Sequence, residues 1–254
     1  MAIYEQPVRE LIKNMIGELA PNLGEAFTRE DALNWFSKRY PKIKAGTISA
    51  HLIRFSINAP SRLHHNPRGD EDRLYQVDSS RFRLFNPETD GPPLHSSADL
   101  SNIREKDKVV TIEESLNPHT STFAYEKDLQ SFLAKNLMLL EPGLKLYIEE
   151  GITGLEFPVD GRFIDILAID KDKNLVVVEL KVSKGHERVV GQIMRYMAWI
   201  EKNLAEAGQK VRGVIVAREI SEDIKLACMY LPQVNVFEYE LSVSLKPIGI
   251  DYFN

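Results

Sequence analysis

Hydrophobic residues recur at helical spacing in three short segments near the start of the chain. The segments cover residues 7–19, 28–40 and 44–54. In each one the apolar side chains fall on one side at a period of about 3.6 residues, which predicts an amphipathic helix. Thr28 stands before two acidic residues, and this order is typical of a capped helix N-terminus.

Two short apolar runs, residues 74–77 and 82–85, follow these helices and flank the polar turn 78–81. Three helices and a hairpin form the pattern of a winged helix-turn-helix domain. In that domain the third helix enters the major groove of DNA and the hairpin touches the flanking backbone. Small three-helix modules also bind proteins, so a protein-contact module is the alternative. We expect this domain over residues 1–90 and a Pro-, Gly- and Ser-rich linker over 91–119.

The remaining residues, 120–254, alternate between helical and strand patterns. A helical pattern comes first, followed by a strand near residue 144 and by two apolar runs that a turn separates. Helix, strand, helix and strand then complete the chain. Alternating helices and strands predict an α/β domain with a mixed sheet.

The two apolar runs predict a β-hairpin, because the turn-forming residues 170–174 separate them. We expect Ile169 to pair with Leu175 across the hairpin. The same register places Asp165 directly opposite Glu179. Residues in that relation point to one face of the sheet, with Cβ atoms about 5 Å apart.

Lys181 shares the face of Glu179, because side chains in a strand alternate with period two. The carboxylates of Asp165 and Glu179 repel each other at this spacing unless a divalent cation lies between them. Oxygen ligands of this kind suit Mg²⁺ or Mn²⁺. With a neighbouring ammonium group, the set indicates a metal-dependent phosphodiester hydrolase. An exposed ion pair at the end of a strand is the alternative interpretation.

The composition is that of a globular protein, with 43% hydrophobic and 27% charged residues among 254. No apolar run approaches the length of a membrane span, and the N-terminus has no signal-peptide pattern. The single cysteine, Cys228, excludes an internal disulfide. We expect a cytoplasmic protein without a membrane partner. A glycine-rich phosphate loop is missing from the sequence, so an NTP is not expected to bind.

The charge distribution favours phosphate binding by the N-terminal part. The net charge is -5, yet residues 32–69 contain seven Lys and Arg and no Asp or Glu. A solvated basic surface is the alternative. We expect the polar residues of the third helix to face outward, toward DNA. The DNA-contact candidates in this part of the chain are Lys42, Lys44, Thr47, Ser49, His51, Arg54 and Arg62.

Three blocks of the C-terminal part resemble the PD-(D/E)xK nuclease superfamily. They are residues 161–165 (GRFID), 178–181 (VELK) and 192–196 (QIMRY). More narrowly, about residues 120 to 245 are similar to the C-terminal nuclease domain of the NucS/EndoMS endonucleases. The resemblance implies a restriction-endonuclease-like mixed sheet flanked by helices. The N-terminal part instead resembles winged-helix modules attached to restriction or defence nucleases.

The resemblance also implies roles for the residues of these blocks. Asp165 and Glu179 would be metal ligands, with the carbonyl of Leu180 as a further oxygen donor. Lys181 would position or activate the attacking water. Gln192, on the following helix, would complete the site, unless it only caps or solvates its helix.

Further roles follow from the same resemblance. Glu126 would bind the metal through water, or would only be a favourable charge near a helix N-terminus. Tyr196 lies one turn from Gln192 and can reach the same side, although packing is the alternative. Phosphate-contact candidates are Arg162, Arg188 and Arg195, and Tyr196 is a further candidate for DNA contact.

We therefore expect an Mg²⁺-dependent (or Mn²⁺-dependent) DNA endonuclease of the restriction or defence type, with DNA read by the N-terminal domain. A homodimer is expected, because a double-strand cut needs two active sites or two visits by one. One alternative is a NucS-type repair endonuclease that selects mismatched or branched DNA. The other is a non-catalytic DNA-binding regulator, against which the intact set of Asp165, Glu179 and Lys181 argues.

Overall fold

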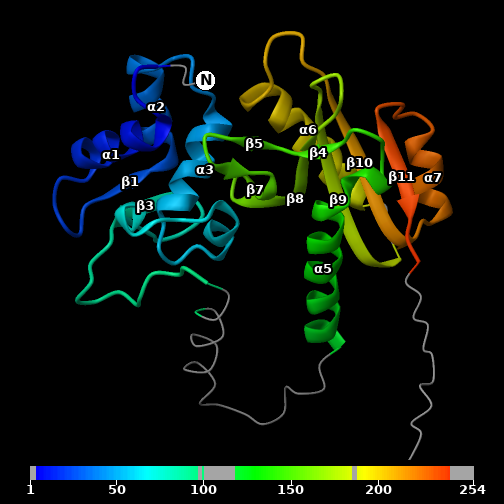
Figure 1. Ribbon diagram of the computed structural model, residues 1–254, viewed down its shortest axis with the longest axis horizontal. Helices are drawn as coiled ribbons and strands as arrows, with labels where there is room; N and C mark the ends of the chain where they lie inside the picture. Colours follow the sequence, from blue (N-terminus) through cyan, green and yellow to red (C-terminus); the bar gives the residue numbers. More distant parts are fainter. Residues whose placement is uncertain (1–3, 97–98, 100–117, 185–187, 241–254) are drawn as a thin grey trace, which may run out of the picture.

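The computed structural model describes residues 4–96, 99, 118–184 and 188–240. The N-terminal part forms a small domain of helices and a three-stranded sheet (Figure 1). Its elements are α1 (Val8–Leu19), β1 (Ala26–Thr28), α2 (Arg29–Arg39), α3 (Ala45–Phe55), the 3₁₀ helices Pro60–His65 and Gly69–Glu71, β2 (Leu74–Gln76) and β3 (Arg81–Leu84). The three expected helices and the hairpin are present. Strand β1, which pairs antiparallel with β3, was not expected from the sequence.

The start of α2 depends on the cap that the sequence predicts. The hydroxyl of Thr28 accepts a hydrogen bond from the amide of Asp31, and the carboxylate of Asp31 accepts one from the amide of Thr28. Such a reciprocal cap satisfies two helix-terminal N–H groups that would otherwise lack partners. The apolar faces of the three helices meet in a core that includes Ile12, Phe36 and Phe55.

The C-terminal part is an α/β domain around a mixed sheet. Its elements are α5 (Pro118–Lys135), the 3₁₀ helix Leu137–Leu139, β4 (Lys145–Leu146), β5 (Ile148–Glu149), β6 (Ile152–Thr153), β7 (Leu155–Val159), β8 (Arg162–Ile169), β9 (Leu175–Lys184), α6 (Arg188–Asn203), β10 (Val211–Glu219), α7 (Glu222–Cys228) and β11 (Val234–Glu238). The strand order is β11-β10-β9-β8-β4, and β7 also pairs with β8. The β8–β9 pair is antiparallel, whereas β9, β10 and β11 run parallel. The expected mixed sheet is therefore confirmed.

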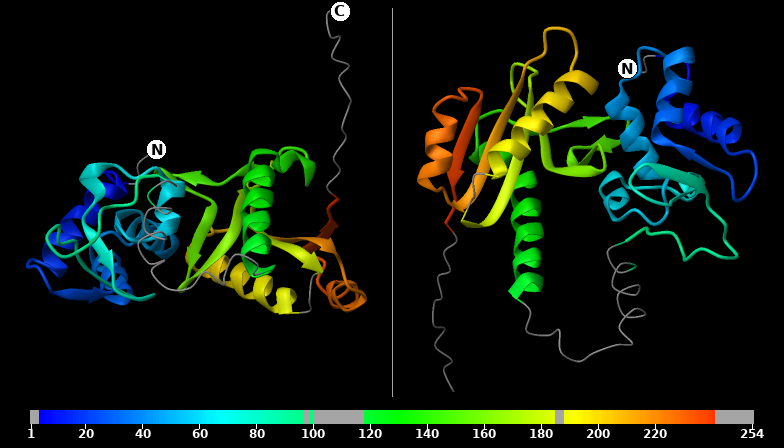
Figure 2. Two further views of the ribbon diagram at one scale, coloured as in Figure 1. Left: turned by 90° about the horizontal axis from the view of Figure 1, so that it is seen from below. Right: turned by 180° about the vertical axis from the view of Figure 1, so that it is seen from behind.

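Helices α5 and α6 cover opposite faces of this sheet (Figure 2). Strand β9 runs through the middle and is buried on both faces, which explains its nearly continuous apolar run. Val176 and Val178 pack in the core beside α5, whereas Leu175 and Val177 pack in the core beside α6. Toward its C-terminal end, β9 carries the polar residues Glu179 and Lys181.

The β8–β9 hairpin has the register that the apolar runs predict. Ile169 pairs with Leu175, and the ladder continues to Ile166 and Val178. The turn is closed by Asp170, whose carboxylate accepts hydrogen bonds from the amides of residues 172 and 174. Extending this register by one step brings Asp165 opposite Glu179.

The two domains pack against each other through α3. This helix contacts β6, β7 and α6 of the C-terminal domain, and it lies beside β7 in Figure 1. The approach is close, because a Cβ built on Gly46 would lie 3.1 Å from Leu204 Cδ1. The linker begins later than the expected boundary at residue 90, since Leu94 is buried and its amide bonds to the carbonyl of Ile57. Within the described ranges, no helix is long and apolar enough to cross a membrane.

Gly154, between β6 and β7, gives a test of the packing of this segment against β8 within the C-terminal domain. A Cβ at this position would lie 1.9 Å from the carbonyl oxygen of Leu167. We expect Gly154→Ala to lower the free energy of unfolding by about 2–4 kcal/mol, because backbone rather than a flexible side chain blocks the space. Urea unfolding measures it. Gly17→Ala in α1 is the control, since its Cβ meets nothing within 4 Å and should stabilise by up to about 1 kcal/mol. Equal stability of the two variants would contradict the packing.

Candidate active site at the end of the β8–β9 hairpin

Three elements bring the polar residues of the site together. The carboxylate of Asp165, on β8, accepts a hydrogen bond of 2.7 Å from the amide of Leu180 on β9. Lys181 Nζ lies 2.6 Å from Glu179 Oε1. Gln192, on α6, donates from Nε2 to the same carboxylate oxygen. The expected set of Asp165, Glu179, Lys181 and Gln192 therefore lies in one place, and Glu179 is at its centre.

Burial sets the protonation of the two carboxyl groups. Desolvation, and then the charge of Glu179, raise the pKa of Asp165 above its usual range. Desolvation also raises the pKa of Glu179, although Lys181 opposes the shift. Two carboxylates that share a buried position favour a bound proton or a bound cation for this reason. Without a counter-charge, the pair costs the folded state free energy at neutral pH.

Lys181 is held as a cation. Burial acts to lower its pKa, but the charge of Glu179 and the hydrogen bond to it raise the pKa above the ordinary value for lysine. An ammonium group in this state donates hydrogen bonds and supplies positive charge. A protonated ammonium group cannot accept a proton. This state therefore favours the positioning role of Lys181 over the role of a base.

The donor atoms of the site are compatible with a divalent cation. Glu179 Oε2 is buried and has no hydrogen-bond partner among the described residues. This oxygen is therefore available to bind a cation. The described residues contain no group of three or more His, Cys, Asp and Glu side chains arranged to hold a metal. Two carboxylates with water completing the shell is a common arrangement for Mg²⁺. Asp165 and Glu179 are the side chains that could hold the ion.

Glu126 lies near this pair on α5. Its negative charge contributes to the raised pKa of both Asp165 and Glu179, so it is close enough to act on both groups. Because it completes no group of three metal-binding side chains, its role as a ligand through water stays a prediction.

Two further contacts support the site. Gln130, buried on α5, donates from Nε2 to the backbone carbonyl of Asp165 at 2.8 Å. Sequence reasoning missed this residue, although it stands four positions after Glu126 and so on the same side of the helix. Tyr196 is buried, and its hydroxyl lies 3.4 Å from Gln192 Nε2. Tyr196 therefore packs in the core beside Gln192, and its role in the site stays a prediction.

The prediction that the polar residues of the third helix face outward is wrong. Thr47, Ser49, His51 and Arg54 on this helix, and Arg62 on the following 3₁₀ helix, have only 0–6% of their surface exposed. Packing of α3 against the C-terminal domain contributes to this burial. Acids outside the acid-free window pair with Arg54 and Arg62. Lys42, Arg162, Arg188 and Arg195 are exposed, and their contact with phosphate stays a prediction.

The partners of Arg54 are protein groups in both domains. Its Nε pairs with Glu71 at 2.9 Å, and its Nη1 donates to the carbonyl of Gly151 across the domain boundary. Arg62 pairs with Asp72 inside the N-terminal domain. Half-buried Lys44 donates to the carbonyl of Ala205 in the other domain. Removing one partner of a buried ion pair typically costs about 3–5 kcal/mol, so neutralising Arg54 would disturb the fold.

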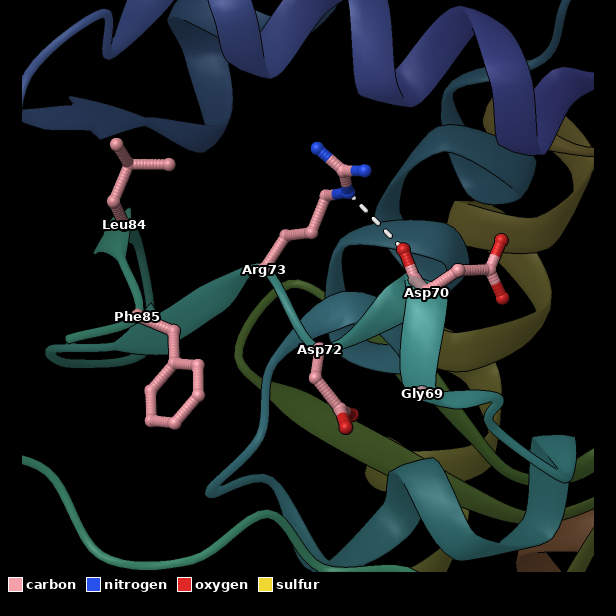
Figure 3. Close-up of a pocket in the computed structure, with 6 residues that line it drawn as sticks. All are labelled: Gly69, Asp70, Asp72, Arg73, Leu84 and Phe85. Carbon is pink, nitrogen blue, oxygen red and sulfur yellow. Dashed lines mark hydrogen bonds between the residues drawn. The ribbon is translucent and has the colours of Figure 1, made fainter. Parts of the chain in front are cut away.

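A pocket in the N-terminal domain lies on other elements and does not include the carboxylate pair. The residues that line it are Gly69, Asp70, Asp72, Arg73, Leu84 and Phe85 (Figure 3). Asp70 pairs with Lys13, and Asp72 pairs with Arg62 and His95. Its acidic groups are therefore already neutralised within the domain.

Comparison with known proteins divides the chain in the same way as the fold. Residues 125–230 match the family model of the endonuclease NucS C-terminal domain, and residues 7–84 match a domain of unknown function, DUF7669. The C-terminal domain is NucS-like. The expected resemblance is thereby confirmed for this domain, and the NucS match does not extend to the N-terminal one.

Curated relatives match over this NucS-like domain. Endonuclease NucS of Pyrococcus abyssi is 32% identical over 101 residues, which are 39% of this chain and 36% of that protein. Endonuclease NucS of Sulfolobus acidocaldarius is 33% identical over 98 residues, 39% of this chain and 35% of that protein. The crystal structure of a repair endonuclease from Pyrococcus abyssi aligns with 28% identity and a TM-score of 0.38, covering 45% of this chain and 46% of that chain. The chain thus spans about a third of the length of these curated relatives.

The raised carboxyl pKa values predict how the metal-free protein responds to pH. A carboxyl group that binds its proton more tightly when folded stabilises the protein below its ordinary pKa of about 4. That stability is lost as the pH rises through the higher folded pKa. Asp165→Asn removes a charge from the pair, and an amide oxygen can still accept from Leu180. We expect the variant to melt above wild type at pH 7.5 in EDTA, by roughly 2–4 °C for each kcal/mol.

The higher melting temperature of Asp165→Asn should disappear at pH 4, where the wild-type pair is protonated. Thermal melts at both pH values measure it. Asp172→Asn, in the exposed turn of the same hairpin, is the control and should change neither melt. A lower melting temperature for Asp165→Asn at pH 7.5 would mean that the pair carries no electrostatic cost.

Proposed function

We propose that this chain is a metal-dependent DNA endonuclease of the NucS repair type. The observation that carries the proposal is the buried Glu179 carboxylate, which contacts Lys181 and Gln192 and lies opposite Asp165 when the hairpin register is extended by one step. One of its oxygens has no hydrogen-bond partner among the described residues. The match of residues 125–230 to the NucS C-terminal domain supports the same conclusion. DNA is the proposed substrate, and Mg²⁺ or Mn²⁺ is the proposed cofactor.

Each residue of the site then has a defined task. Asp165 and Glu179 would hold the ion, with the Leu180 carbonyl as a further oxygen donor. When bound, the ion acts as a Lewis acid on the scissile phosphate and makes a bound water more acidic. Lys181 would orient the attacking water and stabilise the charge that develops on the phosphate.

Two glutamines keep the carboxylates in place. Gln192 fixes Glu179 from α6, and Gln130 fixes the backbone of Asp165 from α5. Helices on both faces of the sheet therefore restrain the two strands at the point of chemistry. A restrained geometry lets fixed charges act on the reaction without reorganising during it.

The repair interpretation replaces the restriction or defence role that the sequence suggested. The curated relatives carry the name Endonuclease NucS, whereas the N-terminal domain matches a family without a known function. We therefore propose mismatched or branched DNA as the substrate in place of a restriction sequence. A homodimer, with one site for each strand, is part of this proposal. The non-catalytic regulator is the alternative that the following experiment tests.

We expect the wild-type protein to cleave mismatched or branched duplexes with Mg²⁺ or Mn²⁺, and perfectly paired or methylated duplexes far more slowly. Lys181→Ala should lower the cleavage rate at least about 100-fold, because it removes a charge directed at the reacting phosphate. Binding of DNA should remain, since the metal pair is intact. A gel assay under single-turnover conditions measures the rates.

Lys225→Ala is the matched control, because Lys225 is an exposed lysine that also pairs with a glutamate, Glu222. Its rate should equal that of wild type. Equal cleavage by Lys181→Ala and wild type would show that the activity comes from elsewhere. No cleavage of any duplex, together with tight binding, would favour the regulator.

A further inference from the structure

The N-terminal domain cannot present its third helix to DNA in this arrangement. Helix α3 contacts β6, β7 and α6, and its polar residues Thr47, Ser49, His51 and Arg54 are buried. Any contact of this domain with a substrate must therefore come from another part of its surface. The hairpin formed by β2 and β3 also reaches the C-terminal domain, at the turn that precedes β8.

Two turns meet at that point. One is the β2–β3 turn, residues 77–81, all of which are exposed. The other is the β7–β8 turn at Asp160 and Gly161. A Cβ built on Gly161 would lie 3.1 Å from the Cβ of Ser79, and the φ angle of Gly161 is 75°, which favours glycine for a second reason. We call residues 77–81 and 160–162 together the two-turn surface.

Arg29 holds the β2–β3 turn rigidly. Its amide donates to the carbonyl of Ser80 at 2.8 Å, and its guanidinium donates to the carbonyl of Ser79 at 2.8 Å. Asp78 closes the same turn from inside, because its Oδ1 accepts from the amides of Ser80 and Arg81. A turn fixed at both sides presents its side chains without a large loss of entropy on binding.

The two-turn surface lies close to the active site along β8. Strand β8 begins at Arg162, and Asp165 follows three residues later, so the separation along the strand is roughly 10 Å. This distance corresponds to about three nucleotide steps of a DNA strand. Arg81 and Arg162 are exposed at this edge, one from each domain. Guanidinium groups bind phosphate oxygens in a bidentate manner.

We propose that the two-turn surface binds the phosphate backbone of the substrate duplex and fixes the scissile bond over the carboxylate pair. The proposal rests on the proposed endonuclease function. Arg81 and Arg162 are the positioning residues, and Arg29 keeps the first of them in place. Asp78 and Asp160 moderate the positive charge of this surface. The N-terminal domain thus contributes its hairpin to the substrate site, whereas its third helix anchors it to the nuclease domain.

Opposite charge changes within one turn test this proposal. Arg81→Ala should weaken binding of a duplex roughly fivefold near 0.1 M salt and lower the salt slope by about 1, because one phosphate contact is lost. Asp78→Asn should tighten binding, since it removes a negative charge while its amide oxygen can still accept from Ser80 and Arg81. Fluorescence anisotropy with a labelled mismatched duplex in Ca²⁺ measures both.

Arg39→Ala is the matched control. Arg39 is also exposed and paired with an acid, Glu18, but it lies at the other end of α2 from Arg29, roughly 15 Å along the helix. Its binding should equal that of wild type. Circular dichroism melts confirm that each variant folds.

The outcomes separate this proposal from the endonuclease function. If wild type binds and cleaves DNA while Arg81→Ala and Asp78→Asn bind as wild type does, the two-turn surface is not the phosphate contact. If Arg39→Ala weakens binding as much as Arg81→Ala, the effect is general charge and the proposal is overturned. If wild type cleaves nothing but the two charge changes shift binding in opposite directions, the surface stands and the endonuclease function fails.

Discussion

The antiparallel register of β8 against β9 is the constraint on which the candidate site depends. It brings Asp165 to the level of Glu179, and the hydrogen bond from the amide of Leu180 to the Asp165 carboxylate fixes this relation. A shift of one residue would turn the polar set to the other face, because strand side chains alternate. The buried apolar run of β9, covered by α5 on one face and α6 on the other, makes such a shift costly.

Burial gives the pair its chemistry. Carboxyl groups in water are ionised at neutral pH, whereas desolvation raises the pKa of both groups here. The free energy that this costs is recovered when a cation or a proton occupies the site. Lys181 and Gln192 bond to one oxygen of Glu179, and the other has no partner in the part of the chain that the structure describes. The electrostatic cost of the carboxylate pair and its capacity to bind a cation therefore have the same origin.

Part of this arrangement could be predicted from the sequence. The hairpin and its register follow from apolar runs and turn formers, and the three central residues follow from the register. Gln130 could not be found in this way, because a single glutamine on a helix does not reveal which strand it faces. The burial of Arg54 was missed for a related reason: its partners Glu71 and Gly151 lie 17 and 97 residues away along the chain. A basic window without local acids resembles a DNA-binding face until such distant partners are known.

The central claim is that Asp165 and Glu179 form a divalent cation site. The most direct measurement is a titration of metal-free protein with Mn²⁺, in which electron paramagnetic resonance reports the free ion. The wild-type protein should take up Mn²⁺ saturably, and a folded double variant, Asp165→Ala with Glu179→Ala, should lose this uptake. Equal uptake by both proteins would contradict the account, because the ion would then bind elsewhere.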